Sequence, residues 1–120
     1  METCWLIYTK KSIRSNPKDN AFNWMVEEGS KAGFKTSVYF EEDFSILIQG
    51  DEEILYYNNT PVTLPQIVIL RTYNYALGDF FESNNVTMIN NSLSLKNCQN
   101  KWKTHSILAQ HSIAMPTTIL

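Results

Sequence analysis

Three short runs of apolar residues constrain the fold more than any other feature of this sequence. They cover residues 4–8, 67–70 and 86–89, and each consists almost entirely of aliphatic, aromatic or β-branched side chains. Runs of this length, without the alternation of a half-exposed strand, are typical of parallel strands that are covered on both faces. We therefore predict that the three runs form adjacent parallel strands of one sheet.

A helix and a further strand are predicted between the first two runs. Asp19 or Asn20 suits the N-cap of a helix that continues to about Ala32, and Gly33 stands where a C-cap glycine belongs. Residues 35–40 then alternate as a strand. Strand, helix and strand in this order form the basic unit of a parallel α/β sheet. The apolar face of the helix consists of Phe22, Met25, Val26 and Gly29.

Residues 41–65 carry a different pattern, which predicts a small antiparallel flap. Residues 44–49 suit a strand, and residues 54–57 and 60–64 flank Asn58-Asn59. Asparagine tolerates the positive φ angles of a two-residue hairpin turn. We therefore expect the last two segments to pair as a hairpin.

The helical and extended patterns together predict the architecture of the chain. A short helix is expected over about residues 76–84, with Leu77, Phe80 and Phe81 on its inner side. The whole is then a single α/β domain with an open, mostly parallel, Rossmann-like sheet. The domain is expected to have three layers, with helices on both faces of the sheet and a small antiparallel hairpin in addition.

Composition excludes several classes of protein. A hydrophobic content of 43% and a charged content of 18% are those of a folded globular chain. The net charge of -2 gives no general attraction to nucleic acid or to anionic lipid. No apolar run approaches the roughly 20 residues that span a bilayer, and the N-terminus does not resemble a signal peptide. We therefore expect a cytoplasmic protein that binds neither nucleic acid nor membrane.

Polar residues follow all three apolar runs, where the predicted strands end, and Thr9 follows the first of them. Arg71 follows the second run, and Asn90, Asn91 and Ser92 follow the third. In an open parallel sheet, ligands collect beyond the carboxyl ends of the strands. A guanidinium suits bidentate contacts with anions, and a helix N-terminus presents free N–H groups to them. Arg71 and the three residues after the third run are candidate substrate contacts, with a salt bridge or cap for Arg71 and plain N-capping for the others as alternatives.

The last part of the chain predicts a helix that begins at Lys101. Asn100 suits its N-cap, and Pro116 ends the helical pattern before strand character returns at residues 117–120. On the residues alone, Lys101 is expected to be an exposed helical lysine.

The residues predict no metal site. His105 and His111 lack a matched nucleophile or a third metal ligand, so both are expected to be structural. The acidic run at residues 41–43 has the composition of a Mg²⁺ site, but a solvated turn is the expected interpretation. Cys4 and Cys98 have no metal-ligand spacing.

Three motifs near the end of the chain carry a resemblance to a known family. They are Asn91-Ser92 after the third run, Asn100-Lys101 at the helix start, and the run from Ser112 to Thr118 around Pro116. Together they resemble the end of the N-terminal domain of ATP-grasp ligases, nearest to the RimK-like amino-acid ligases. Nearly the entire chain matches the pre-ATP-grasp domain of that family in order and length. It departs from the family pattern at Asn100, where Asp is usual, and at Ser112, where Gly is usual.

The resemblance implies an activity for the parent protein. RimK-like enzymes phosphorylate a carboxylate with Mg-ATP and then let an amine attack the acyl phosphate. The corresponding lysine of the family reaches toward the ATP phosphates, so Lys101 is expected to contact ATP in the parent. The resemblance also implies that residues 1–120 form one pre-ATP-grasp domain. The catalytic ATP-grasp domain, with the adenine pocket and the metal ligands, is expected after residue 120, so the fragment alone is expected to be inactive and to hold no catalytic residue.

The resemblance further implies the partners of this domain. They are the missing catalytic domain and an amino-acid or protein-tail substrate, and homo-oligomerisation stays open. Reactions in the family include glutamate addition to a protein tail, peptide-like ligation and carrier modification in a lysine pathway.

A free-standing α/β binding or regulatory module without catalysis is the alternative. A receiver domain needs acidic residues after the first strand, where this chain has Thr9-Lys10-Lys11. A dinucleotide-binding domain needs a G-x-G-x-x-G motif there, and the chain has no glycine at that place. These absences disfavour two kinds of module and leave an interaction module open. The reading frame downstream of Leu120 distinguishes the two hypotheses.

Overall fold

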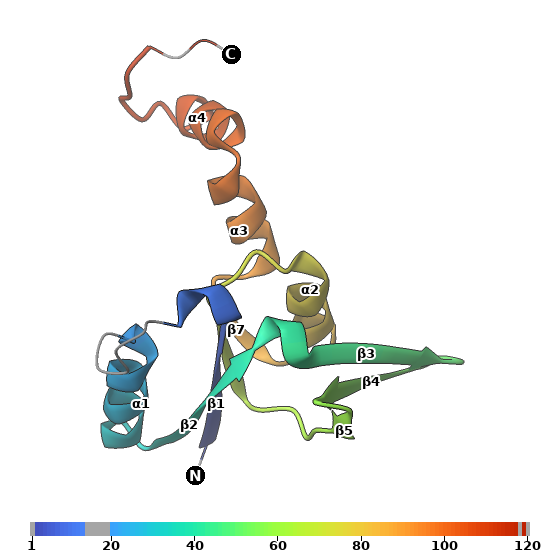
Figure 1. Ribbon diagram of the computed structural model, residues 1–120. Coiled ribbons are helices and arrows are strands. Elements are labelled where there is room, and N and C mark those ends of the chain that lie inside the picture. Colours follow the sequence, from blue (N-terminus) through green and yellow to red (C-terminus); the bar gives the residue numbers. More distant parts are fainter. Residues whose placement is uncertain (1, 14–19, 118, 120) are drawn as a thin grey trace.

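The computed structural model describes residues 2–13, 20–117 and 119 (Figure 1). In chain order, its elements are β1 (Glu2–Tyr8), the 3-10 helix η1 (Lys10–Ser12), α1 (Ala21–Lys31), β2 (Phe34–Phe40), the 3-10 helix η3 (Glu41–Asp43), β3 (Phe44–Gln49), β4 (Glu52–Tyr57), β5 (Thr60–Pro61), β6 (Ile67–Leu70), α2 (Tyr75–Ser83), β7 (Thr87–Ile89), α3 (Ser92–Gln99) and α4 (Lys101–Gln110). Among the described residues, no helix has the length and apolar character needed to cross a membrane.

The central sheet has four strands in the order β2-β1-β6-β7, and all neighbours are parallel. The prediction that the three apolar runs form adjacent parallel strands is confirmed. The register places Ile7 opposite Leu70 and Ile69 opposite Ile89. Strand β1 lies inside the sheet, and its residues from Cys4 to Tyr8 are all buried. This burial explains why the run shows no polar alternation.

Two layers cover the sheet, one on each face, as the sequence predicted. Because successive side chains of a strand point to opposite faces, Cys4, Leu6 and Tyr8 pack on α1, whereas Trp5 and Ile7 pack toward α2. The helix α1 begins after Asn20 and ends before Gly33, whose φ of 90° is the left-handed value that glycine adopts without strain. Asp19, the other predicted N-cap, lies outside the described residues.

Strands β3, β4 and β5 form a separate antiparallel sheet, so the predicted flap is confirmed. Asn58 and Asn59 adopt φ angles of 49° and 63° and make the expected turn. The strand expected over residues 60–64 was predicted too long, because β5 covers only Thr60–Pro61. Proline has no N–H for a strand ladder, which limits pairing at this edge. The longer hairpin joins β3 to β4 through Gly50-Asp51, a turn that the sequence analysis did not predict.

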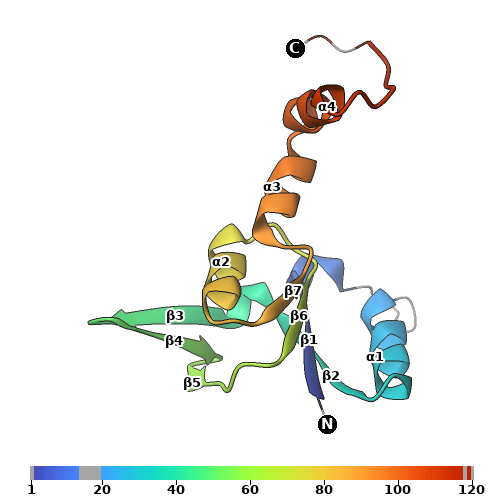
Figure 2. The ribbon, with the colours of Figure 1, turned by 180° about the vertical axis from the view of Figure 1, so that it is seen from behind.

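The helices α3 and α4 extend from the body as an arm, and Figures 1 and 2 show α4 at the end of the arm that is farther from the sheet. The Cα radius of gyration is 17.0 Å, whereas a compact chain of this length would have about 14 Å. The arm and the projecting β3–β4 hairpin account for this elongated shape. Strand character was predicted for residues 117–120, but Thr117 and Ile119 lie in no strand, and residues 118 and 120 are outside the described residues.

Ser112, which follows the C-cap residue His111 of α4, has a φ of 57°. Its N–H donates to the carbonyl oxygen of Ala109 at 3.1 Å, and the N–H of Ile113 donates to that of Leu108 at 3.1 Å. This is the left-handed helix ending at which glycine is most frequent. The departure from the family pattern at Ser112 therefore places a side chain at a strained backbone position.

We expect Ser112→Gly to stabilise the end of α4 by about 0.5–1 kcal/mol, because glycine adopts positive φ angles without a steric cost. Amide hydrogen exchange in the last turn of α4 should slow by about two- to fivefold. The matched control is Ser106→Gly, an exposed position inside the same helix, which should instead speed exchange because glycine disfavours helix interiors. Equal effects at both positions would contradict the prediction.

Candidate functional site

The carboxyl ends of the parallel strands bring Arg71 and the segment Asn90–Ser92 to one edge of the sheet. The N–H of Arg71 donates to the carbonyl oxygen of Ile7 at 2.8 Å, which extends the pairing of β1 and β6 by one residue. The side chain of Arg71 is exposed. The ion pairs found among the described residues do not include Arg71. Its guanidinium therefore remains accessible to an anion at this edge.

Asn90 and Asn91 form the turn that leads from β7 into α3. Asn90 has a φ of 63°, which asparagine tolerates better than most residues. The side-chain oxygen of Asn91 accepts a hydrogen bond from the N–H of Ser94 at 2.9 Å and thus caps α3. The capping alternative is therefore realised for Asn91, and both Asn90 and Asn91 are exposed.

Ser92 is only 4% exposed and is enclosed by α2. Its N–H donates to the carboxylate of Glu82 at 2.7 Å. A Cβ atom at Gly78 of α2 would lie 2.7 Å from Oγ of Ser92, so α2 and α3 approach each other closely here. The negative charge of Glu82 already occupies the positive end of the α3 dipole. An external anion at this helix end would have to compete with that carboxylate.

An open groove of about 430 Å³ lies where α2 meets the junction of α3 and α4. Its cation is Lys96, whose Nζ lies 5.4 Å from the centre of the Tyr75 ring and 3.9 Å from Oδ2 of Asp79. The sequence analysis did not identify Lys96 as a candidate site residue. Lys96 is four residues after the candidate Ser92, and this spacing puts the two residues on the same side of a helix, which was the available signal. The groove is lined by Tyr75, Lys96, Gln99 and Asn100.

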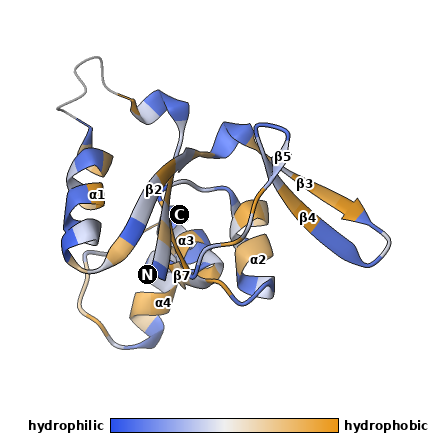
Figure 3. Cartoon of the chain, turned by 90° about the horizontal axis from the view of Figure 1, so that it is seen from below, coloured by the Kyte–Doolittle hydropathy of each residue, from blue (hydrophilic) through white to orange (hydrophobic). Residues whose placement is uncertain are grey.

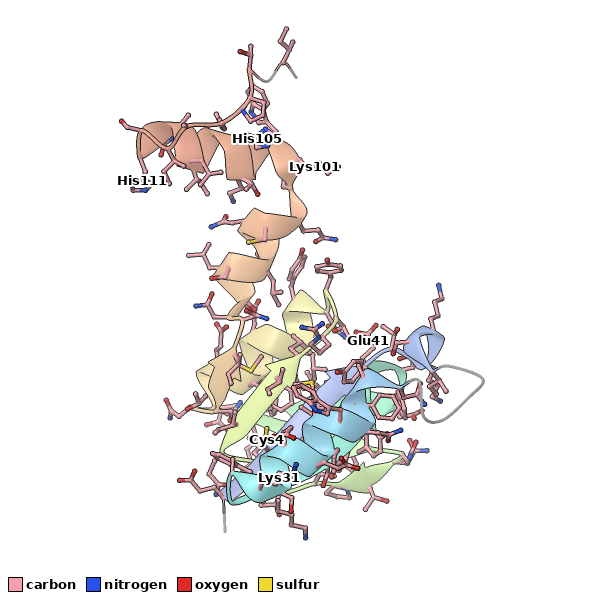
Figure 4. The ribbon with its side chains drawn as sticks, turned by 90° about the vertical axis from the view of Figure 1, so that its left-hand side faces the viewer. Cys4, Lys31, Glu41, Lys101, His105 and His111 are labelled. Atoms are coloured by element: carbon pink, nitrogen blue, oxygen red, sulfur yellow. The ribbon has the colours of Figure 1, made fainter. Side chains whose placement is uncertain are left out.

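Lys101 is the first residue of α4 and is exposed. Asn100, which lines the groove, caps this helix by accepting a hydrogen bond from the N–H of Lys103 at 3.0 Å. Thr104 donates its hydroxyl to the carbonyl oxygen of Asn97 at 2.6 Å and so links α4 to α3. Figure 4 shows Lys101 where α4 begins, on the arm. The backbone thus places Lys101 directly beside the groove.

The structure does not bring all the candidate residues into one cluster. Ser92 begins α3, and Lys101 follows the end of this helix. The eight residues of α3 correspond to about 12 Å at the rise of an α-helix. Arg71 and Asn90 lie at the sheet edge, whereas Lys101 lies at the far end of α3. The candidate site is therefore an extended surface, with Lys96 between its two ends.

The acidic run at residues 41–43 forms the 3-10 helix η3 and contacts Lys10. Nζ of Lys10 lies 2.8 Å from Oδ1 of Asp43. The backbone N–H of Lys10 donates to the carboxylate of Glu42 at 2.8 Å. The hydrogen bond to Asp43 raises the pKa of Lys10. The part of the chain that the structure describes contains no group of three or more His, Cys, Asp or Glu side chains that could hold a metal ion.

A second cavity, of about 260 Å³, lies on the face of the sheet beside α1. Its walls are almost entirely apolar, and burial raises the pKa of the Cys4 thiol within it. Small-molecule sites combine an apolar wall with a few polar groups that orient the ligand. Glu28 and Thr36 are the charged or hydroxyl residues in its lining, and Arg71 and the segment Asn90–Ser92 are not part of it, so we do not assign the site to it.

The parallel sheet, the covering helices and the polar residues after the strand ends define an open α/β domain of the kind that binds ligands at its carboxyl edge. No protein-family model matches the chain. The chain is similar to the alpha-aminoadipate–LysW ligase LysX of Sulfolobus acidocaldarius, with 32% identity over 100 residues, which are 80% of this chain and 34% of the ligase. It is also similar to LysX of Saccharolobus solfataricus, with 33% identity over 98 residues, again 80% of this chain and 34% of the ligase.

The two similar proteins are ligases. This finding supports the resemblance to the N-terminal region of ATP-grasp ligases in general. The chain spans about a third of the length of these relatives. The similarity does not confirm the finer prediction of a RimK-like enzyme.

Proposed function

We propose that the chain is the N-terminal domain of an ATP-dependent carboxylate–amine ligase of the RimK-like kind. The observation that carries this proposal is the similarity to two ligases over 80% of the chain. The confirmed parallel sheet supports it, because its carboxyl edge leads into Asn91 and Ser92, which belong to one of the motifs of the family resemblance. The catalytic ATP-grasp domain then belongs to the part of the parent protein after residue 120.

The described residues fit one part of an ATP site. Lys101 and Lys96 supply positive charge along the arm, and a lysine ammonium suits phosphate contacts. No carboxylate cluster for Mg²⁺ is present among the described residues. We therefore assign the Mg²⁺ ligands and the adenine pocket to the catalytic domain. Mg-ATP would supply the phosphoryl group that activates the substrate carboxylate, and catalysis would depend on positioning and charge neutralisation.

In this proposal Arg71 and Asn90 contribute to the acceptor pocket. Arg71 offers an accessible guanidinium for a substrate carboxylate, and Asn90 offers an exposed amide. Asn91 and Ser92 act mainly by holding α3 in place, through the cap to Ser94 and the hydrogen bond to Glu82. Lys101 contacts the ATP phosphates from the arm.

The test uses the full-length parent with Mg-ATP, an amino-acid carboxylate and an amine. Free α-aminoadipate and free glutamate are suitable amino-acid probes, because one is in the names of the relatives and the addition of the other to a protein tail is a reaction of the RimK-like family. ADP release that depends on the carboxylate, with a new amide bond seen by mass spectrometry, supports the proposal. A parent protein that has no ATP-grasp domain after residue 120 would refute it.

The chain of residues 1–120 by itself is expected to bind Mg-ATP weakly or not at all. Residues 1–120 contain only a part of the proposed nucleotide site, namely Lys96, Lys101 and the helix ends. Single charge contacts of this kind give little affinity in water. Isothermal titration calorimetry with Mg-ATP measures this directly. Micromolar binding would contradict the expectation and favour an independent nucleotide-binding module.

A further inference from the structure

The strand β3 forms an open edge of the antiparallel sheet. The sheet has the order β3-β4-β5, and among the described residues β3 pairs only with β4. Every second residue of such a strand points its N–H and C=O groups outward, where another strand can pair with them. Figures 1 and 2 show β3 and β4 projecting from the body beyond α2.

The two edges of this sheet differ in a way that points to pairing at β3. The β5 edge is two residues long and contains Pro61, which blocks a strand ladder. The β3 edge is six residues long and contains no proline and no charged residue. Its side chains Leu47 and Ile48 are 43% and 68% exposed. Figure 3 colours most of β3 as hydrophobic. An edge with these properties can act as a template for pairing with a strand of another chain.

We propose that β3 pairs with β3 of a second copy of this chain, antiparallel and about a two-fold axis. The two antiparallel sheets would then join into one continuous sheet. When β3 pairs with its own copy, both strands of the pair consist of the same uncharged residues. No two like charges therefore face each other along the strand. One face of β3 carries Phe44, Ile46 and Ile48, and a second β3 related by a two-fold axis would continue this apolar face across the pair. This inference is independent of the proposed ligase function.

Charges at the two ends of β3 select the register. A two-fold axis through Leu47 would place Asp43 opposite Asp51 of the other copy, because 43 and 51 lie equally far from 47. Like charges directly opposite each other destabilise a strand pair. An axis through Ile46 places Asp43 opposite Gln49 instead, and its nearest like-charge pair, Glu41 with Asp51, lies farther outside the paired strands. It also places the exposed Ile48 opposite Phe44 of the other copy, which makes an aliphatic–aromatic pair.

Sedimentation velocity from micromolar to millimolar concentration tests the pairing. The chain is expected to show a monomer–dimer equilibrium, since a single strand pair buries less area than a standard stable interface. Leu47→Lys and Ile48→Lys should each weaken the dimer at least about tenfold, because each change enters the symmetric interface twice. The matched control is Leu93→Lys on α3, where the side chain is 63% exposed, and it should leave the dimer unchanged. Circular dichroism melts check that all variants stay folded.

Disulfide trapping tests the register. In the proposed pairing Ser45 lies opposite Leu47 of the other copy, and opposite Cα atoms in an antiparallel pair are about 4.5–5.5 Å apart, which suits a disulfide. The exposed Cys98 is first replaced by Ser, while Cys4 is buried. A mixture of Ser45→Cys and Leu47→Cys chains, oxidised by oxidised glutathione, should cross-link faster than either variant alone. Faster cross-linking of Leu47→Cys alone would overturn the register. A chain that stays monomeric at all concentrations, or a dimer that Leu47→Lys and Ile48→Lys do not weaken, would overturn the pairing itself.

Discussion

Replacement of Lys101 by alanine in the full-length parent is expected to lower ATP-dependent turnover by about ten- to a hundredfold. In the proposed function, the change would remove a charge-assisted contact with the ATP phosphates worth roughly 1.5–3 kcal/mol. Lys101 begins α4 and is exposed, so its ammonium is free to contact an anion held by the neighbouring domain. The N-terminal end of the helix adds a positive field at the same place.

The control for this experiment is Lys103→Ala, because Lys103 is another exposed lysine in the first turn of α4. It should leave turnover nearly unchanged. Both variants should keep the melting temperature of the parent, since exposed helical substitutions usually change stability by about 0.5 kcal/mol or less. Unchanged kinetics for Lys101→Ala would assign this lysine to the solvated face of the helix and remove it from the site.

Replacement of Gly29 by alanine is expected to destabilise the domain by about 1–2 kcal/mol. A Cβ atom at this position would clash with Oγ1 of Thr36 and lie 3.1 Å from its Cβ. Alanine favours a helix over glycine by up to about 1 kcal/mol, but overpacking of this kind typically costs about 1–3 kcal/mol or more. The clash should exceed the gain in helix propensity, because α1 lies directly on β2 at this point.

Urea denaturation measures the free energy of unfolding for this variant. Ser30→Ala is the matched control, since Ser30 is the exposed neighbour of Gly29 in α1, and it should be neutral or slightly stabilising. Thr36→Ala in the Gly29→Ala background removes two of the three nearest atoms and should restore part of the stability. A Gly29→Ala variant as stable as the parent would show that α1 shifts on the sheet at little cost.

Much of the fold followed from local signals in the sequence. The buried strand at residues 4–8 was visible because a strand covered on both faces needs apolar side chains at every position. Gly33 marked the end of α1, and Asn58-Asn59 marked a turn, because these residues tolerate positive φ angles. Asn100 was predicted as a cap and accepts the N–H of Lys103. Each of these features depends on a few neighbouring residues.

The candidate site was predictable only in part, for the same reason. The placement of Arg71 and Asn90 at strand ends follows from the order of the elements. The groove beside Lys96 does not follow from that order. It forms because Tyr75 of α2 lies close to Lys96 of α3, although the two residues are far apart in the sequence. The role of Lys101 depends on the family resemblance and remains a proposal.

The sequence by itself determined which segments become strands and helices, and where most of them end, because backbone preferences and hydrophobic periodicity act over a few residues. Only the tertiary structure decided how these segments use their side chains. It enclosed Ser92 between Glu82 and Gly78, which no local pattern indicates. It also left β3 at an open edge with Ile48 exposed. Burial and edge position depend on contacts between residues far apart in the chain, and such contacts leave little trace in the local sequence.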